Sequence, residues 1–391
     1  MFEDVLATSM SRLGTETAFS VLAKARDLEA QGREIIHLEI GEPDFCTPGH
    51  IVEAAVEALK NGFTHYTPAP GLQDVRAAIA EYASRQKGVP YEADEVVVTP
   101  GAKPIMFFAI LALVNPGEEV ICPDPGFPIY SSVVNFVGGK AVPIPLREEN
   151  GFSVDLDELG ALISPKTKML ILNSPGNPCG NLLPWEDMAR VAGMVRGRNI
   201  VVLSDEIYDR IVYDDARPVS ITSMPGMKDW TIVLDGFSKA YAMTGWRLGY
   251  GLMHRDLASR IAQLMVNSNS CTAAFIQKAS QAALTGPQDG TEAMVKEFDR
   301  RRRIMVEGLN SIPGFSCSTP RGAFYVFPSI RGTGLSSQGM EDRMLSQAGV
   351  ATLSGKSFGG FGEGYLRLSY ANSMTNLERA LERIDNLAKG L

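Results

Sequence analysis

The sequence predicts an α/β protein in which a large domain, built on a mostly parallel sheet, is joined to a smaller α+β domain. From residue 94 onward, short apolar runs alternate with helical stretches, as in a sheet covered by helices. After residue 285 the pattern changes to a long charged helix followed by short strands. The length of 391 residues exceeds what one hydrophobic core usually serves, which also favours two domains.

The elements of the N-terminal segment and of the large domain follow from hydrophobic patterning. A first helix is predicted over residues 15–31, where Leu22, Ala25 and Leu28 share one side. Buried strands are predicted at residues 96–98, 120–122, 169–172, 200–203 and 231–234. Helices are predicted between them at residues 102–113, 129–136 and 185–196. Because these strands are apolar throughout, both faces of their sheet must be covered by helices, which indicates parallel strands.

The C-terminal part is predicted to form the smaller domain. A charged helix is expected at residues 292–309, short strands at 324–327 and 366–368, and a last helix at 375–387. The N-terminal residues precede the large sheet and are expected to pack against this smaller domain. The predicted division is therefore an N-terminal segment (1–44), a large domain (45–285) and a small domain (286–391).

Charge and hydropathy exclude two classes of partner. The net charge is −8 and the pI is about 5.2, which does not suit a nucleic-acid binder. The one basic run, Arg300 to Arg303, follows Glu292 and Glu297 in a helix-like stretch and is expected to be a solvated, salt-bridged face. No apolar run approaches the roughly 20 residues of a membrane span, so no membrane partner is expected.

Cysteine and histidine usage argues against disulfides and metals. The five cysteines are scattered without a CxxC pair, and the four histidines lie far apart without HxxxH spacing. The N-terminus also lacks a signal-peptide pattern. We therefore expect no metal centre and a reducing, cytoplasmic setting.

Polar side chains follow three of the predicted strands, at the point where each strand ends. They lie in the runs 173–178, 204–208 and 235–239. The candidate reactive residues in these runs are Asn177, Asp205, Tyr208 and Lys239. Ligands of parallel sheets bind beyond the carboxyl ends of the strands, so these groups are expected to meet at one edge. Singly, Lys239 would be a surface lysine and Asp205 a helix cap. Jointly, they indicate a reactive site.

These runs resemble the class I/II pyridoxal-phosphate-dependent aminotransferases, and the bacterial aspartate aminotransferase-like subgroup in particular. The run 236–249 resembles the family's cofactor-lysine signature, NSPGNPCG its Asn-Pro turn, and SDEIY its Asp-x-x-Tyr segment. The segments 40–45 and 66–72 resemble the entrance of the substrate pocket and a dimer-crossing loop. The similarity covers nearly the whole chain in the family's order. It implies fold type I with a seven-stranded sheet, pyridoxal 5′-phosphate as cofactor, and a homodimer with shared sites.

The resemblance also implies roles for the residues around the cofactor ring. Lys239 would hold the cofactor as a Schiff base, the internal aldimine, and then serve as the base of a ping-pong transamination. Asp205 would pair with the protonated pyridine nitrogen and keep the ring an electron sink. Asn177 and Tyr208 would donate to the ring's phenolic oxygen. Phe127 would stack on the ring rather than merely fill the core.

The cofactor phosphate needs backbone N–H groups at a helix start and positive charge. Gly101, Ala102 and Lys103 lie between a predicted strand and its helix and would supply the first. Arg247, eight residues after Lys239, would supply the second. Ser238 is a candidate hydroxyl donor, although Gly236 stands where relatives often have a phosphate-binding serine.

Other matching positions would bind the substrate or complete the site. Arg367 matches the arginine that binds the substrate α-carboxylate, a task suited to a planar guanidinium. Gly41 and Asn177 would also contact the substrate. Tyr66 matches the tyrosine that the neighbouring subunit donates to the phosphate.

Substrate choice depends on Lys103. In the subgroup it resembles, this lysine reaches the distal carboxylate of aspartate or glutamate, but it could equally serve the phosphate. Ala18, which stands where acidic-substrate relatives carry a hydroxyl, argues against the acidic substrate, as does Ser354-Gly355 in place of a common Pro-Gly step.

Two further functions stay open. A β-lyase or an amino-acid oxidase would use the same lysine and cofactor. A non-catalytic, cofactor-binding regulatory module is disfavoured by the acidic chain, in which the first helix begins within about a dozen residues of the N-terminus.

Overall fold

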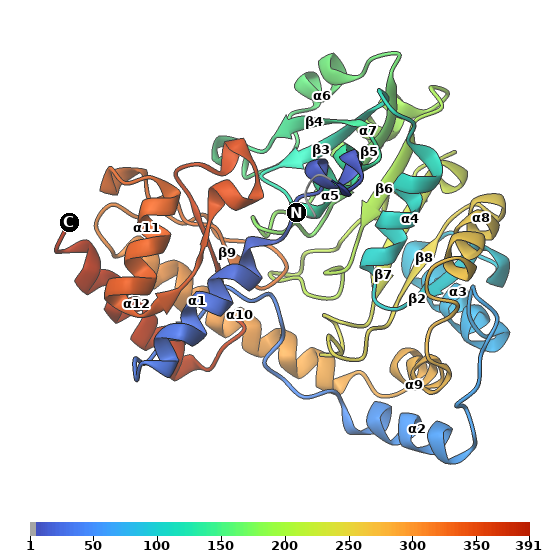
Figure 1. The fold of residues 1–391 in the computed structure, drawn as a ribbon, viewed down its shortest axis with the longest axis horizontal. Helices are drawn as coiled ribbons and strands as arrows, with labels where there is room; N and C mark the ends of the chain where they lie inside the picture. Colours follow the sequence, from blue (N-terminus) through green and yellow to red (C-terminus); the bar gives the residue numbers. More distant parts are fainter. Residues whose placement is uncertain (1–4) are drawn as a thin grey trace.

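A seven-stranded sheet lies at the centre of the large lobe in the computed structural model, which describes residues 5–391 (Figure 1). Its strand order is β2-β8-β7-β6-β5-β3-β4. The strands are β2 (Val96–Thr99), β3 (Glu119–Asp124), β4 (Lys140–Pro145), β5 (Thr167–Asn173), β6 (Val201–Asp205), β7 (Thr231–Gly236) and β8 (Gly249–Leu252). β8 runs antiparallel to both of its neighbours, and the other adjacent pairs are parallel. The predicted, mostly parallel sheet is confirmed.

Two strands of this seven-stranded sheet were absent from the pattern-based prediction, for reasons visible in their composition. β4 reads KAVPIP, and its two prolines are tolerated because it is the edge strand of the sheet. β8 reads GYGL, and its glycines weaken the apolar signal. A Cβ on Gly249 would lie 2.4 Å from the backbone nitrogen of Ala102, so this glycine allows the chain at Ala102 to approach the sheet.

Helices cover both faces of the sheet, as predicted. They are α2 (Gly49–Lys60), α3 (Gln73–Lys87), α4 (Lys103–Leu113), α5 (Ile129–Phe136), α6 (Leu156–Leu162), α7 (Trp185–Val195), α8 (Arg255–Val266) and α9 (Ala274–Thr285). Alternate residues of β5 enter different apolar clusters. Leu170 packs with residues of α6 and α7, whereas Ile171 packs with residues of α4, α5 and α8. The strands are therefore buried on both faces, which explains their uniformly apolar sequence.

The C-terminal part packs with the N-terminal residues (Figure 1). It contains α10 (Asp289–Asn310), α11 (Ser337–Arg343), α12 (Met374–Ala388), and the antiparallel strands β9 (Tyr325–Val326), β11 (Leu353–Ser354) and β12 (Leu366–Ser369). β1 (Ile36–His37) pairs in parallel with β10 (Val350–Ala351), and α1 (Thr17–Ala30) contacts β10 and β11. The exact domain boundaries stay a prediction.

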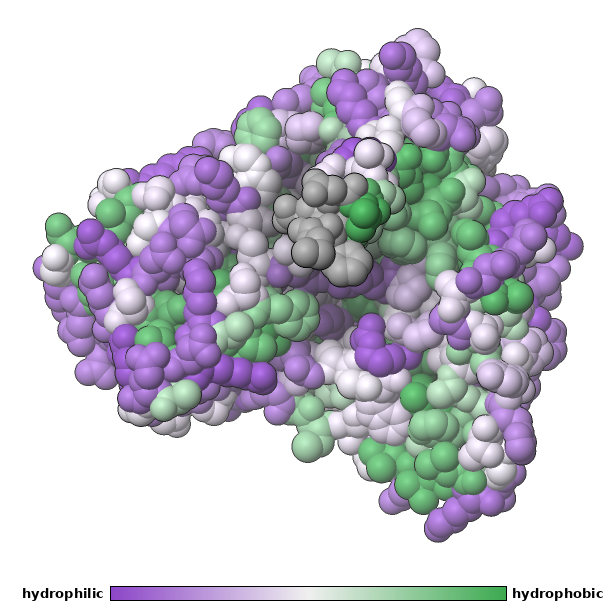
Figure 2. All heavy atoms as spheres, in the orientation of Figure 1, coloured by the Kyte–Doolittle hydropathy of each residue, from purple (hydrophilic) through white to green (hydrophobic). Residues whose placement is uncertain are grey.

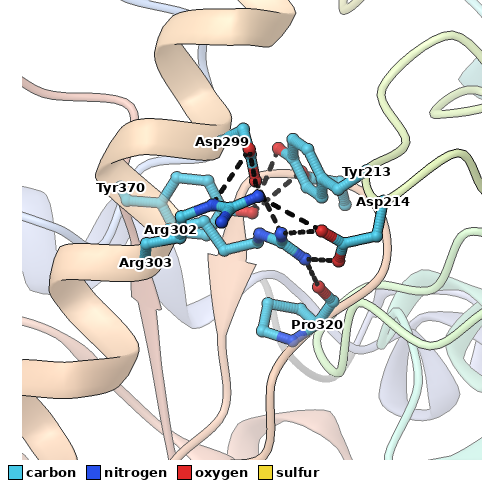
Figure 3. Close-up of polar contacts among 8 residues, drawn as sticks. Tyr213, Asp214, Asp299, Arg302, Arg303, Pro320 and Tyr370 are labelled. Atoms are coloured by element: carbon cyan, nitrogen blue, oxygen red, sulfur yellow. Dashed lines mark hydrogen bonds and ion pairs between the residues drawn. The ribbon is translucent and has the colours of Figure 1, made fainter.

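The basic run on α10 departs from its prediction. Arg301 and Arg302 are only 6% and 1% exposed, so the face is not simply solvated. Arg302 forms ion pairs with Asp214 at 2.7 Å and with Asp299 at 2.6 Å (Figure 3). The reason is helical periodicity. Arg302 lies in the stripe of buried residues that includes Met294, Phe298, Met305 and Leu309. The prediction of ion pairing is confirmed.

Two properties of the described residues concern the expected absence of a membrane span and of disulfides. Among residues 5–391, no helix has the length and apolar character needed to cross a membrane. The five cysteines are free thiols, four of them at least partly buried and Cys46 exposed.

Candidate active site

A cavity of about 530 Å³ opens where β5, β6 and β7 end at the carboxyl edge of the sheet. Most of the predicted site residues line it, namely Gly41, Ala102, Lys103, Phe127, Asn177, Asp205, Tyr208, Ser238, Lys239, Arg247 and Arg367. These residues come from seven separate segments of the chain. The expectation that the strand-end groups meet at one edge is therefore met in the structure.

Lys239 lies in the turn that follows β7. Its Nζ donates a hydrogen bond to the carbonyl oxygen of Gly41. Burial of the amine, and next the positive charge of Arg367, lower the pKa of Lys239 to about 8, while Glu42 and Glu16 oppose that shift. About a tenth of this amine is therefore neutral, and nucleophilic, at pH 7.

Asp205 ends β6 and is held in a fixed orientation. Its Oδ2 accepts a hydrogen bond from the hydroxyl of Tyr130 at 2.6 Å, and its Oδ1 accepts one from the backbone N–H of Ile207 at 3.2 Å. Burial raises the pKa of Asp205 to about 6, and the Tyr130 hydroxyl opposes that rise. The sequence prediction missed Tyr130. Its position three residues after Phe127, next to the start of a predicted helix, was the available signal.

Asn177 and Tyr208 approach the cavity from two different turns. The Asn177 Oδ1 accepts a hydrogen bond from Arg367 at 3.2 Å, which leaves its amide NH₂ group to donate elsewhere. The Tyr208 hydroxyl is 2.7 Å from the hydroxyl of Tyr325 on β9. Tyr325 was also missed, because a tyrosine in a short strand gives no signal of a site.

An anion cradle forms at the start of α4. Gly101 has a φ of +85°, and a Cβ there would lie 2.2 Å from the Arg247 Nη2 atom, so the guanidinium rests against the glycine turn. Ala102 and Lys103 begin the helix and face the cavity. Free N–H groups at a helix start, next to a guanidinium, suit a phosphate. Ser238 lines the same cavity.

Arg367 is a buried cation with neutral partners. It is 5% exposed and donates to the Asn177 Oδ1 and to the backbone carbonyl of Glu39. Its guanidinium lies over the rings of Tyr325 and Phe358, at 4.5 and 5.1 Å from their centres. Within residues 5–391, no carboxylate lies within 4 Å of it, and its Nε has no acceptor. Such a group is suited to bind an anion that enters from the cavity.

Lys103 is the residue whose setting differs most from the prediction. Its ammonium pairs with the carboxylate of Glu16 and lies 5.2 Å from the centre of the Phe127 ring. Glu16 precedes α1 and lines the cavity together with Ala18 and Phe19. Glu16 was not among the predicted site residues, because its partner is 87 residues away in the sequence.

Two predicted residues lie off the cavity wall. Gly101 is placed directly behind it, against Arg247. Tyr66 is 90% exposed and does not line the cavity of its own chain. Gly41 does line it, and there a Cβ would lie 2.2 Å from the hydroxyl oxygen of Tyr325.

Comparison with known proteins agrees with this geometry. Residues 33–384 match the family described as aminotransferase class I and II. The chain is 41% identical to an aspartate aminotransferase of Pyrococcus abyssi, over 95% of this chain and 96% of that protein. It is 39% identical to an aromatic-amino-acid aminotransferase of Thermococcus litoralis, with the same coverage.

Solved structures of aminotransferases are also similar to this chain. The aspartate aminotransferase of Rhizobium meliloti superposes with a TM-score of 0.94, at 37% identity over 98% of both chains. An alanine aminotransferase of Pyrococcus furiosus superposes with a TM-score of 0.93, at 32% identity, over 99% of this chain and 100% of that one.

Proposed function

The chain belongs to the aminotransferase class I and II family, and we propose that its cavity binds pyridoxal phosphate and transfers the amino group of an acidic amino acid to a 2-oxo acid. That the chain is an aminotransferase of fold type I follows from the family itself, whose members use this cofactor. One observation carries the cofactor proposal. A lysine with a lowered pKa and a fixed, buried aspartate face one cavity, beside an anion cradle.

Each part of the cofactor has a group to match. The cradle of Gly101 and Arg247 suits the phosphate, and the oriented carboxylate of Asp205 suits a protonated ring nitrogen. The free NH₂ group of Asn177 and the hydroxyl of Tyr208 suit the ring oxygen. When bound, pyridoxal phosphate supplies an electron sink that stabilises negative charge on the substrate α-carbon.

The chain's own groups would then position the substrate and move one proton. Arg367 would bind the α-carboxylate with a forked pair of hydrogen bonds and so orient the α-C–H bond. The Lys239 Nζ would hold the cofactor covalently in the resting enzyme. As a free amine, the same Nζ would serve as the base that accepts the proton of the α-C–H bond. A pKa of about 8 suits such a base near neutral pH.

The test of the function is a single-turnover reaction with a panel of amino acids. We expect the visible absorbance of the bound cofactor to convert to that of its amine form, and a 2-oxo acid to restore it. Release of more than one keto acid per site without an added amino acceptor would instead favour a β-lyase or an oxidase, because transamination stops once the cofactor holds the amino group. Cofactor binding without any conversion would favour a regulatory module.

The acidic substrate rests on Lys103, a cation on the cavity wall. Removing a charge-assisted hydrogen bond to a carboxylate costs roughly 1.5–3 kcal/mol. Lys103→Ala should therefore lower kcat/KM for aspartate and glutamate about ten- to a hundredfold, and far less for alanine. Equal losses for both kinds of donor, with weaker cofactor binding, would assign Lys103 to the phosphate. The relatives described as aspartate, aromatic and alanine aminotransferases make this comparison informative.

We also propose a homodimer with shared sites. Exposed apolar side chains gather on one side of α2, where Figure 2 shows an apolar area, at Val52, Val56 and Leu59. Tyr66 lies a few residues beyond this helix and is free to reach a neighbouring chain. Mixing Tyr66→Phe with Arg367→Ala subunits should regenerate some wild-type sites, because one site in each heterodimer would carry neither change. No recovery after subunit exchange would count against sharing.

The cytoplasmic location stays a prediction.

A further inference from the structure

Glu16 places a carboxylate beside Lys103 in the cavity wall, which also contains the carboxylates of Glu42 and Asp205. It stands at the start of α1, and its partner Lys103 is the first residue of α4. The negative charge of Glu16 also acts on Lys239, where it opposes the lowering of the lysine pKa. A substrate that brings a second carboxylate toward Lys103 would therefore meet Glu16 first.

The Glu16–Lys103 pair is well suited to exchange. The Lys103 side chain is 47% exposed and that of Glu16 is 19% exposed. Ion pairs with one partner this accessible contribute little to stability, because water screens them. Another carboxylate of similar geometry can therefore replace Glu16 on the Lys103 ammonium at small cost.

A displaced Glu16 would have a second position available. Glu16 is the residue that precedes the first turn of α1, in an extended conformation (φ −88°, ψ 123°). Its side chain makes no capping hydrogen bond there, and the first turn of α1 contains no acidic residue. Free N–H groups and the helix dipole attract a carboxylate at this end. The side chain can thus alternate between Lys103 and its own helix.

We propose that Glu16 is a specificity-determining residue, the internal counter-ion of Lys103. It pairs with Lys103 while the substrate side chain is uncharged, and it yields Lys103 to the distal carboxylate of an acidic substrate. This inference rests on the proposed function, in which two substrates use one cavity in turn. It means that Lys103 has a carboxylate partner in the same cavity whether the substrate side chain is acidic or neutral.

The first test replaces the carboxylate with an amide in the holoenzyme. Glu16→Gln should raise kcat/KM for glutamate about two- to fivefold, because no internal carboxylate competes, and should lower or leave unchanged that for alanine. Asp27→Asn is the matched control, since it removes one negative charge from an exposed position on the same helix. It should change neither value. Equal changes for both donors in Glu16→Gln would overturn the proposal.

A double-mutant cycle separates the pair from a general charge effect. In the Lys103→Ala background, Glu16→Gln should no longer change the ratio of kcat/KM for glutamate and alanine. A ratio that changes as much as in the wild type would mean that Glu16 acts without Lys103, contrary to the proposal. Glu16→Ala also lacks the carboxylate, so it must shift the ratio in the same direction as Glu16→Gln.

A binding measurement keeps this inference distinct from the proposed function. Succinate and propionate differ by one carboxylate and do not react, so calorimetry on the holoenzyme can compare them without turnover. Glu16→Gln should increase the preference for succinate about two- to fivefold. An unchanged preference would overturn the role of Glu16, even if transamination is observed. Failure of every amino acid to react would reject the proposed function but leave the binding result interpretable.

Discussion

Two buried arginines in this molecule are chemically identical but have opposite surroundings. Arg302, inside α10, faces the carboxylates of Asp214 and Asp299 and donates to the carbonyl of Pro320 (Figure 3). Arg367, on β12, has a carbonyl and an amide oxygen instead, and within residues 5–391 no carboxylate lies within 4 Å. A buried charge is costly unless it is paired. The first arginine therefore stabilises the scaffold, and the second is ready for an anion from outside.

The lysines repeat this contrast. Lys87 on α3 lies 2.6 Å from Glu206 and 3.7 Å from Asp209, and these charges raise its pKa despite the opposing effect of burial. Lys239 donates to a backbone carbonyl, and its pKa is lowered to about 8. In both comparisons, the cation without a carboxylate partner lines the cavity. For these buried cations, a missing carboxylate partner marks the site more clearly than burial does, whereas the half-exposed Lys103 of the same cavity is paired with Glu16.

The largest expected effect is at Lys239. Lys239→Ala should abolish the visible absorbance of the bound cofactor and lower kcat by at least about 10³-fold, because the nucleophile and base are lost together. The fold should survive, since the amine makes one hydrogen bond to Gly41. Spectroscopy, single-turnover kinetics and thermal unfolding measure the three quantities. An unchanged visible spectrum would move the cofactor to another lysine.

Lys87→Met is the matched control for that variant. It leaves the carboxylate of Glu206 buried without its ammonium partner, which should destabilise the protein by about 3–5 kcal/mol. If Lys87→Met is as stable as the wild type, the distinction between Lys87 as a scaffold residue and Lys239 as a site residue is wrong.

Arg367→Met should come next in size. Losing two charge-assisted hydrogen bonds to the substrate α-carboxylate should lower kcat/KM about 10²-fold for acidic and neutral amino acids alike. The free energy of unfolding should change little or increase, because an uncompensated cation leaves the interior. Steady-state kinetics with two donors and denaturant unfolding test both points. A large loss of stability with normal kinetics would make Arg367 a scaffold residue.

Arg302→Met should show the opposite pattern. We expect a loss of about 2–3 kcal/mol in the free energy of unfolding, less than for a fully buried pair because Asp214 stays 47% exposed. The values of kcat and KM per folded molecule should not change. Arg302 also holds the pKa of Asp214 below its usual value. That contribution to stability is present at neutral pH and lost as pH falls through the lowered pKa, so the variant should differ least from wild type in acid.

The smallest effect in this series of comparisons is expected at Tyr130. Tyr130→Phe removes a hydrogen bond that keeps the pKa of Asp205 from rising further above about 6. More of the carboxyl is then protonated at a given pH, and its attraction for a positive ring nitrogen weakens. Cofactor affinity at pH 7 should fall about three- to tenfold, and more steeply at pH 6. Cofactor titrations across pH measure this. A uniform loss at every pH would indicate a packing role instead.

The sequence by itself determined the fold class and the carboxyl-edge position of the site. Both depend on local patterns, because apolar runs set the strands and polar residues directly after them must lie at one edge. The strands β4 and β8 were not predicted, because prolines and glycines obscure their apolar pattern. Tyr130 and Tyr325 were not predicted as site residues either. Their roles depend on the hydrogen-bond partner of each hydroxyl, which lies in a distant segment of the chain.

Only the tertiary structure decided which charges are paired. Arg302 meets a carboxylate 88 residues away, Lys103 meets one 87 residues away, and Arg367 reaches an amide 190 residues away. No local pattern encodes such distances, and the side chains alone cannot distinguish a paired arginine from an unpaired one. The free energy of a buried charge depends on what packing places within a few ångströms of it. That packing separates the cations of the scaffold from those of the site.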